Sequence, residues 1–129
     1  MKRIKSISDK RLIVEGVVNG KASNFLVDTG ASLALMDYDQ RKKYELSVGK
    51  SYHGTIVGAG GEMRNVKYCN TFVHIEDRVI PQFLLADISG VVESIKRETG
   101  IEILGIISLP QMKMANLSID CNDNLIIIE

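Results

Sequence analysis

The sequence NFLVDTGASLALMD, residues Asn24–Asp37, sets the organisation of this chain. Two apolar runs, Phe25–Val27 and Leu33–Met36, enclose the short polar segment Asp28–Ser32. Apolar runs of this length around a glycine-containing turn predict two buried strands. An ionised carboxylate in an apolar setting is unfavourable unless it has partners. We therefore expect Asp28 to be a buried carboxylate that is kept for a chemical task.

The overall composition predicts one ordinary globular domain over residues 1–129. The chain is 45% hydrophobic and 25% charged, and 16 basic residues balance 16 acidic ones. A balanced charge gives no global field that would attract nucleic acid or an anionic membrane surface. No apolar run is long enough for a membrane span. Charged residues interrupt the first segment, which argues against a signal peptide, so we expect a cytoplasmic protein.

The order of turn signals and β-branched runs predicts a mainly β fold, a closed or partly closed barrel-like sheet with one to three short helices. Asn19-Gly20 predicts a tight hairpin between strands 11–18 and 22–27. A second hairpin has Gly58–Gly61 at its tip and the arms 55–57 and 66–68. A third turn follows at 76–78. Three helices are predicted: a short exposed helix at 38–44 after a cap at Asp37, a helix at 90–98 between Ser89 and Gly100, and a helix after Ser108. The remaining strands are a buried strand at 101–104 and closing strands at 114–120 and 125–128.

The histidines and cysteines of the chain do not form a recognisable metal-binding or catalytic motif. His53 and His74 are the only histidines, and they lie far apart without flanking ligands, so we expect no metal site and no cofactor. Cys69 and Cys121 lack metal-ligand spacing and are interpreted as buried thiols. The remaining candidate for chemistry is the Asp28 segment.

Asp28-Thr29-Gly30 between two apolar strands resembles the signature of the retropepsin-like aspartic peptidases, the retroviral-type family with a single lobe. Two later elements of that family have counterparts in the same order. A glycine-rich flap hairpin corresponds to Val57–Gly61, and an apolar-apolar-Gly element before a short helix corresponds to Ile103–Gly105. The resemblance covers roughly residues 12–129 and implies the single-lobed acid protease fold.

The resemblance also implies an aspartic endopeptidase that hydrolyses an extended peptide or protein substrate. Two carboxylates that share one proton would activate a water molecule. Gly30 would allow two such loops to approach, and Thr29 would hydrogen-bond to the opposing loop. No other aspartate precedes Thr-Gly or Ser-Gly, so Asp28 of a second chain must complete the site in a homodimer. The residues implied in peptide binding are Ala31, Val57, Gly58, Ala59, Gly60 and Gly61.

Four questions stay open at the level of sequence. The same fold could serve as a peptide-binding or assembly module with little proteolysis. The glycine hairpin could be a flexible tip and not a flap, and it has no aromatic residue at its tip. Leu125–Ile128 could join a sheet shared between two subunits or could be an internal core strand. The segment Ile88–Glu102 is longer than the retroviral counterpart and could be a helical insertion beside the cleft, with Lys96 and Arg97 exposed.

Overall fold

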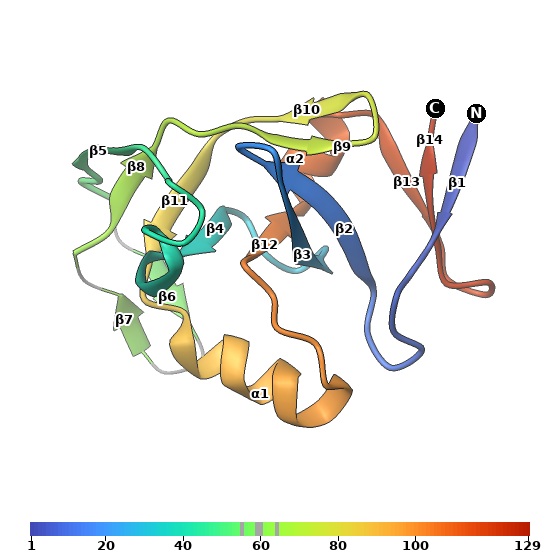
Figure 1. Cartoon of the computed structure of the whole chain (residues 1–129), viewed down its shortest axis with the longest axis horizontal. Helices are drawn as coiled ribbons and strands as arrows, with labels where there is room; N and C mark the ends of the chain where they lie inside the picture. Colours follow the sequence, from blue (N-terminus) through green and yellow to red (C-terminus); the bar gives the residue numbers. More distant parts are fainter. Residues whose placement is uncertain (55, 59–60, 64) are drawn as a thin grey trace.

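Most strand residues of this computed structural model belong to one strongly bent nine-stranded sheet (Figure 1). The structure describes residues 1–54, 56–58, 61–63 and 65–129. The strand order across the sheet is β10-β9-β2-β3-β12-β4-β11-β8-β5, and the sheet does not close on itself. Its strands are β2 (Ile13–Val18), β3 (Lys21–Asp28), β4 (Ala34–Asp37), β5 (Val48–Ser51), β8 (Lys67–Cys69), β9 (Val73–Ile75), β10 (Arg78–Ile80), β11 (Phe83–Ala86) and β12 (Gly105–Ser108).

Two smaller sheets complete the β structure. The first has the order β1-β14-β13 and holds both chain termini at one side of the molecule (Figure 1). The second is the hairpin of β6 and β7, at the opposite side of the molecule near α1 (Figure 1). The bounds of these strands and of the helices are β1 (Lys2–Lys5), β6 (Ile56–Gly58), β7 (Gly61–Met63), β13 (Leu117–Asp120), β14 (Leu125–Ile128), the 3-10 helix η1 (Tyr38–Gln40), α1 (Ser89–Thr99) and α2 (Leu109–Met114).

Strand β12 explains how the sheet presents the segment around Asp28. It lies between β3, to which it is parallel, and β4, to which it is antiparallel. The loop from β3 to β4 must therefore pass over the end of β12. Gly105 permits the close approach to β4, because a Cβ atom there would collide with the Leu35 carbonyl oxygen. The position thus needs glycine for packing between strands.

Hydrophobic side chains cover both faces of the central strands. Phe25, Met36 and Ile107 belong to the core on the side of α2 and the three-stranded sheet. On the other face, Leu35 and Ile106 pack with α1 and with the β6–β7 hairpin. Alternate residues of the same strands thus reach opposite cores, as the two-residue period of a strand requires.

The first hairpin confirms its sequence prediction. Asn19 and Gly20 have φ angles of 50° and 78°, as a type I′ turn requires. Asp37 caps η1 by accepting the Asp39 N–H, and Gly100 ends α1 in the left-handed conformation. The β9–β10 turn at Glu76 and Asp77 also forms as predicted.

Several details of the sequence prediction were wrong. Of the helix predicted at 38–44 only Tyr38–Gln40 is helical, and the strand predicted at 114–120 begins at Leu117. Residues 101–104 form no strand; the strand comes next, at Gly105–Ser108, where the regular pairing with β3 begins, although the Leu104 N–H already donates to the Asn24 carbonyl at 2.7 Å. The glycine hairpin returns through Gly61–Met63, whereas Lys67–Cys69 pairs with β11 in the large sheet. Ser89 is the first residue of α1 and not its cap; its N–H and hydroxyl both donate to Asp87 Oδ1.

Leu125–Ile128 is an internal strand, which answers one of the open questions. β14 pairs with β1 on one edge and with β13 on the other, so both of its edges are occupied within the chain. Ile126 and Ile128 are buried. The outer edges of this sheet belong to β1 and β13.

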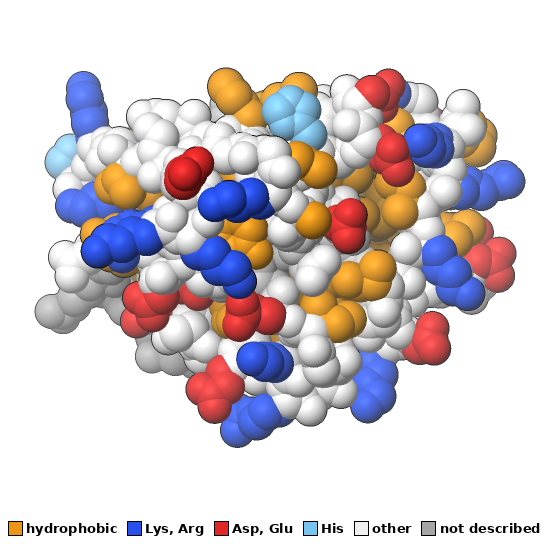
Figure 2. Space-filling model, in the orientation of Figure 1, with side chains coloured by type: hydrophobic (Ala, Val, Ile, Leu, Met, Phe, Trp, Pro, Cys, Tyr) orange, Lys and Arg blue, Asp and Glu red, His pale blue; other side chains and the backbone are white. Residues whose placement is uncertain are grey.

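The surface is of mixed charge. On the face shown in Figure 2, basic and acidic side chains alternate without a large patch of one sign. In the part of the chain that the structure describes, no helix has the length and hydropathy that a membrane crossing requires. Of the two free cysteines, Cys69 is buried but Cys121 is exposed on a turn, so the prediction of two buried thiols holds only for Cys69.

Candidate active site

Asp28 is the last residue of β3 and begins the loop that crosses β12. Its Oδ1 accepts the Gly30 N–H at 2.9 Å, and its carbonyl oxygen accepts the Ala31 N–H at 3.1 Å. The Ala31 carbonyl in turn accepts the N–H of Leu109 at 3.3 Å, at the start of α2. The loop is therefore held at both ends, and the carboxylate is oriented by a backbone donor.

The expectation of a buried carboxylate was wrong for the single chain. Asp28, Thr29 and Gly30 are all exposed. Phe25 and Ala34 are fully buried, as expected of the flanking strands. The strands are thus buried, but they end at the surface, and they deliver the three polar residues to solvent.

Gly30 has no positive φ, so its small size is the property to explain. A Cβ atom at this position would lie 3.3 Å from Asp28 Oδ1. That is a tight contact, which would push against the carboxylate that the Gly30 N–H orients. Glycine therefore keeps the space beside Asp28 open.

Ser108 lies beneath this loop, and the sequence analysis gave it no role beyond a helix cap. In the parallel pairing of β12 and β3, Ser108 stands opposite Asp28. It is fully buried, it makes no side-chain cap to α2, and its hydroxyl has no hydrogen-bond partner among the described residues. The element next to Asp28 and directly before the helix is thus Ile106-Ile107-Ser108, three residues after the predicted Ile103-Leu104-Gly105.

The glycine hairpin lies where the resemblance predicts a flap. Ile56 pairs with Met63, Val57 with Glu62 and Gly58 with Gly61. Ile56 is buried in the same cluster as Val92 of α1 and Leu35 of β4, so the base of the hairpin rests on the core near the loop. Ala59 and Gly60, also predicted to bind substrate, lie outside the described residues.

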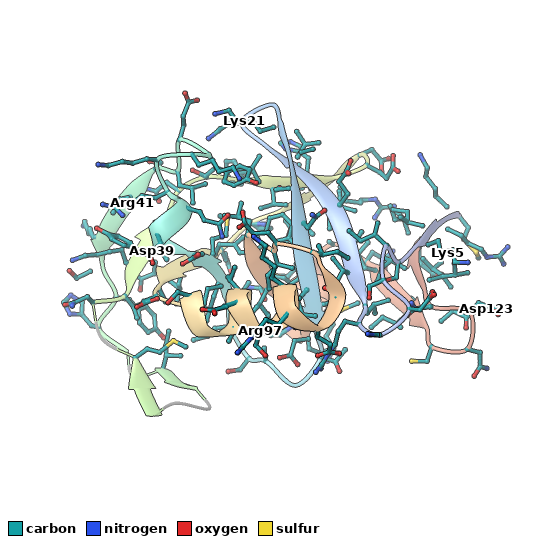
Figure 3. All side chains as sticks on the ribbon, turned by 60° about the horizontal axis from the view of Figure 1, so that its bottom comes forward. Lys5, Lys21, Asp39, Arg41, Arg97 and Asp123 are labelled. Carbon is teal, nitrogen blue, oxygen red and sulfur yellow. The ribbon has the colours of Figure 1, made fainter. Side chains whose placement is uncertain are left out.

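The segment Ile88–Glu102 carries α1, which packs Val92 and Ile95 against this core. Lys96 and Arg97 are exposed, as predicted, and Figure 3 shows Arg97 on the helix in front of the sheet. The segment is therefore helical, and it packs against the base of the glycine hairpin.

An ion pair joins this helix to the chain just before β2. Arg11 Nε and Nη2 donate to Glu98 Oε1 and Oε2, each at 3.0 Å. This bidentate hydrogen bond lowers the pKa of Glu98 below its ordinary value. The same bond is the main cause that raises the pKa of Arg11, and the Asp28 carboxylate adds to it through its charge.

A cavity of about 510 Å³ opens beside the strand that leaves the loop. Leu33 connects it to the Asp28 segment, and Gln111 of α2 contributes a buried amide whose Oε1 has no partner among the described residues. The rest of the lining is largely aromatic and apolar, from Tyr52, Tyr68, Phe72, Pro81, Phe83 and Leu84. Asp28 is not part of this lining.

One acidic cluster has the spacing of a metal site. Ligand atoms of Asp37, Asp39 and Asp87 lie within 4.8 Å of one another. Asp37 already accepts hydrogen bonds from Asp39 N and Gln40 Nε2, and Asp87 accepts two from Ser89. Both oxygens of Asp37 and Oδ1 of Asp87 are therefore used in the fold. Figure 3 shows Asp39 on the side of the molecule that also carries Arg41.

A model of a protein family described as aspartyl protease matches residues 14–110, well over half of the chain. The chain therefore belongs to the aspartyl protease family. The matched range includes Asp28-Thr29-Gly30, the glycine hairpin, α1 and β12. No curated protein matches the sequence.

Solved structures of retropepsin-like proteases share the fold. The EIAV protease complexed with the inhibitor HBY-793 superposes with a TM-score of 0.64 at 19% identity, covering 91% of this chain and 99% of that one. The retroviral protease-like domain of Ddi1 from Leishmania major gives 0.62 at 20% identity, with coverages of 92% and 88%. A retropepsin-like aspartic protease from Rickettsia conorii gives 0.61 at 20% identity, with coverages of 98% and 97%. At these identities, the likeness establishes the retropepsin-like fold.

Proposed function

We propose that this protein is an aspartic endopeptidase that is active as a homodimer, with one Asp28 from each subunit. The observation that carries the proposal is the exposed Asp28 at the end of a buried strand, with Oδ1 oriented by the Gly30 N–H. A single oriented carboxylate cannot act as acid and base at once. The site is complete only when a second chain supplies its own Asp28.

The two carboxylates would work as a pair that shares one proton, because like charges at close distance cannot both ionise comfortably. The ionised group takes a proton from a water molecule that attacks the peptide carbonyl carbon. The protonated group donates to the carbonyl oxygen as the tetrahedral intermediate forms. Thr29 and Gly30 would hold the two loops together across the two-fold axis.

The substrate would be an extended peptide between the paired loops and the glycine hairpin. Backbone groups of Gly58 and Gly61 in β6 and β7 can bond to a peptide backbone and exclude water when the hairpin closes. Ala31, Val57, Ala59 and Gly60 complete the proposed contacts.

Leu109 supports the position proposed for the dimer axis. It is 38% exposed although it is apolar, and its N–H bonds to the Ala31 carbonyl in the Asp28 loop. Both edges of β14 are paired within the chain. We therefore expect the subunits to meet through the Asp28 loops and through the outer edges of β1 and β13, without exchange of C-terminal strands.

A peptide-library assay combined with sedimentation tests the proposal. We expect a dimer and cleavage of internal peptide bonds at acidic to mildly acidic pH, which Asp28→Asn abolishes. A strict monomer at micromolar concentration would contradict the proposal. A dimer that binds peptides but cleaves none would instead favour the peptide-binding or assembly module. Equal cleavage by the wild type and Asp28→Asn would mean that the activity comes from a contaminant.

A further inference from the structure

The cavity of about 510 Å³ lies next to the candidate active site without being part of it. Neither Asp28 nor any residue assigned to peptide binding lines it. Its lining nevertheless meets the Asp28 loop at two points: Leu33 follows the loop, and Gln111 belongs to α2, whose Leu109 N–H donates to the Ala31 carbonyl at 3.3 Å. The volume is within the range of about 300–1,000 Å³ that is usual for ligand sites.

Gln111 supplies this cavity with a buried hydrogen-bond acceptor. The residue is 3% exposed, and its Nε2 donates to the Gln82 carbonyl at 3.3 Å. Because a carbonyl oxygen can only accept, this bond fixes which end of the amide is Nε2. The other end, Oε1, has no partner among the described residues. A buried acceptor without a donor is unfavourable, so the cavity suits a group that brings an N–H or an O–H.

The conformation of Gln82 also marks the cavity as a site. Gln82 has a φ of 67°, which residues other than glycine and asparagine seldom adopt. Backbones held in such conformations are concentrated at binding and active sites. The bond from Gln111 holds the Gln82 carbonyl, so the turn before β11 and the helix α2 are tied together at the cavity.

The rest of the lining decides what kind of group can enter. The described lining residues are all uncharged, so a charged group would lose water there without gaining an ionic partner. Four aromatic rings belong to the lining, and those of Tyr52 and Tyr68 meet edge to face at 5.5 Å. Phe72, another of them, is 56% exposed although it is apolar. Aromatic rings pack well against other rings, so the lining favours a neutral aromatic group with a donor. Among side chains, tyrosine and tryptophan fit this description.

We propose that this cavity binds a tyrosine or tryptophan side chain of the peptide substrate, at a position away from the bond that is cleaved. The substrate role rests on the proposed function. Leu33 continues from the Asp28 loop, and Tyr52 comes shortly before Ile56 at the base of the glycine hairpin, so both sides of the proposed peptide groove lead to the cavity. The ring of the bound side chain lies against the aromatic lining, and its O–H or N–H donates to Gln111 Oε1.

A binding experiment that needs no turnover tests the site itself. N-acetyl-tyrosinamide and N-acetyl-phenylalaninamide, which differ by one hydroxyl, are titrated by NMR into the wild type, Gln111→Met and Phe72→Ala. Gln40→Met is the matched control for the amide, because Gln40 also has a buried Oε1 without a partner but lies outside the cavity. Val79→Ala is the control for the ring, because Val79 is 47% exposed and also lies outside the cavity. Each variant is checked for folding by its melting curve.

We expect the wild type to bind the tyrosine probe at least about fivefold more tightly than the phenylalanine probe, with shifts in the Gln111 side-chain amide signals. Gln111→Met should remove this preference, because it removes the acceptor. Phe72→Ala should weaken the binding of both probes and keep the preference. Gln40→Met and Val79→Ala should behave like the wild type.

Cleavage tests the role of the site with substrate. In one peptide selected from the library, each position in turn is made tyrosine or phenylalanine, and kcat/KM is measured for both. We expect tyrosine to be preferred at one position away from the cleaved bond, and this preference to be lost in Gln111→Met and kept in Gln40→Met.

Equal binding of the two probes by the wild type, or a preference that Gln111→Met retains, would overturn the inference. The expected probe binding together with equal cleavage of tyrosine and phenylalanine peptides at every position would overturn the substrate role. A wild type that cleaves no peptide but binds the probes as expected would support the binding site and refute only the peptidase.

Discussion

Two aspartates at the two ends of one stretch, Asp28 before the loop and Asp37 at the end of β4, have opposite environments. Asp37 is 3% exposed and its two oxygens accept hydrogen bonds from Asp39 N and Gln40 Nε2. Asp28 is exposed, and Oδ1 accepts only the Gly30 N–H among the described residues. The buried carboxylate is satisfied by its own chain and serves the fold. The exposed one remains available for a second chain and for substrate.

The largest expected difference between the two aspartates is the effect of their replacement on peptide cleavage. Asp28→Asn removes a group that must exchange protons, so we expect cleavage to fall by at least about 100-fold. Asp37→Asn keeps an acceptor for the cap and should retain cleavage within a few-fold. The measurement is kcat/KM on one peptide selected from the library. Loss of activity in Asp37→Asn at unchanged stability would contradict this division.

Replacement of Asp37 should destabilise the fold more than replacement of Asp28. Asp37→Ala removes the cap of η1 and leaves Gln40 without one buried partner, a change expected to cost about 1–3 kcal/mol. Asp28→Ala removes an exposed side chain and should change the free energy of unfolding by only about 0.5 kcal/mol or less. Urea unfolding at one fixed protein concentration compares the two variants. A larger loss in Asp28→Ala than in Asp37→Ala would show that the roles are reversed.

Glu98 provides a third carboxylate, half-buried and paired, and the smallest expected effect. The hydrogen bond from Arg11 lowers the pKa of Glu98 in the folded protein. Glu98 therefore stabilises the fold at pH values above its unfolded pKa, which is near 4.5. This stabilisation is lost as pH falls from about 4.5 through the lower pKa that Glu98 has in the folded protein. The difference in stability between the wild type and Glu98→Gln should therefore shrink in this range. A difference that grows on acidification would contradict the assigned sign.

Local chemistry made much of the fold predictable from sequence. Asn19-Gly20 requires a turn with two positive φ angles, and Gly100 requires a left-handed helix end; both formed as expected. The apolar runs around Asp28 became buried strands. These features depend on neighbouring residues alone, which is why the sequence reveals them.

The errors arose where distant segments decide the outcome. Ile103 and Leu104 are buried without being part of a strand, because the regular ladder with β3 begins at Gly105, one residue after the Leu104 N–H bonds to the Asn24 carbonyl. The exposure of Asp28 and the placement of Ser108 beneath it depend on the passage of the loop over β12. The ion pair of Arg11 with Glu98 was missed, because it joins residues 87 positions apart in the sequence. The cytoplasmic location stays a prediction.

The central claim is that two chains each provide one Asp28, and subunit mixing tests it most directly. A constant amount of wild-type protein is mixed with increasing amounts of Asp28→Asn, and peptide cleavage is measured after subunits have exchanged. Asp37→Asn, added in the same way, serves as the control and should not inhibit. We predict that excess Asp28→Asn drives cleavage toward zero, because each wild-type subunit becomes trapped in a mixed dimer with one aspartate. Cleavage that stays constant while mixed dimers form would contradict the account.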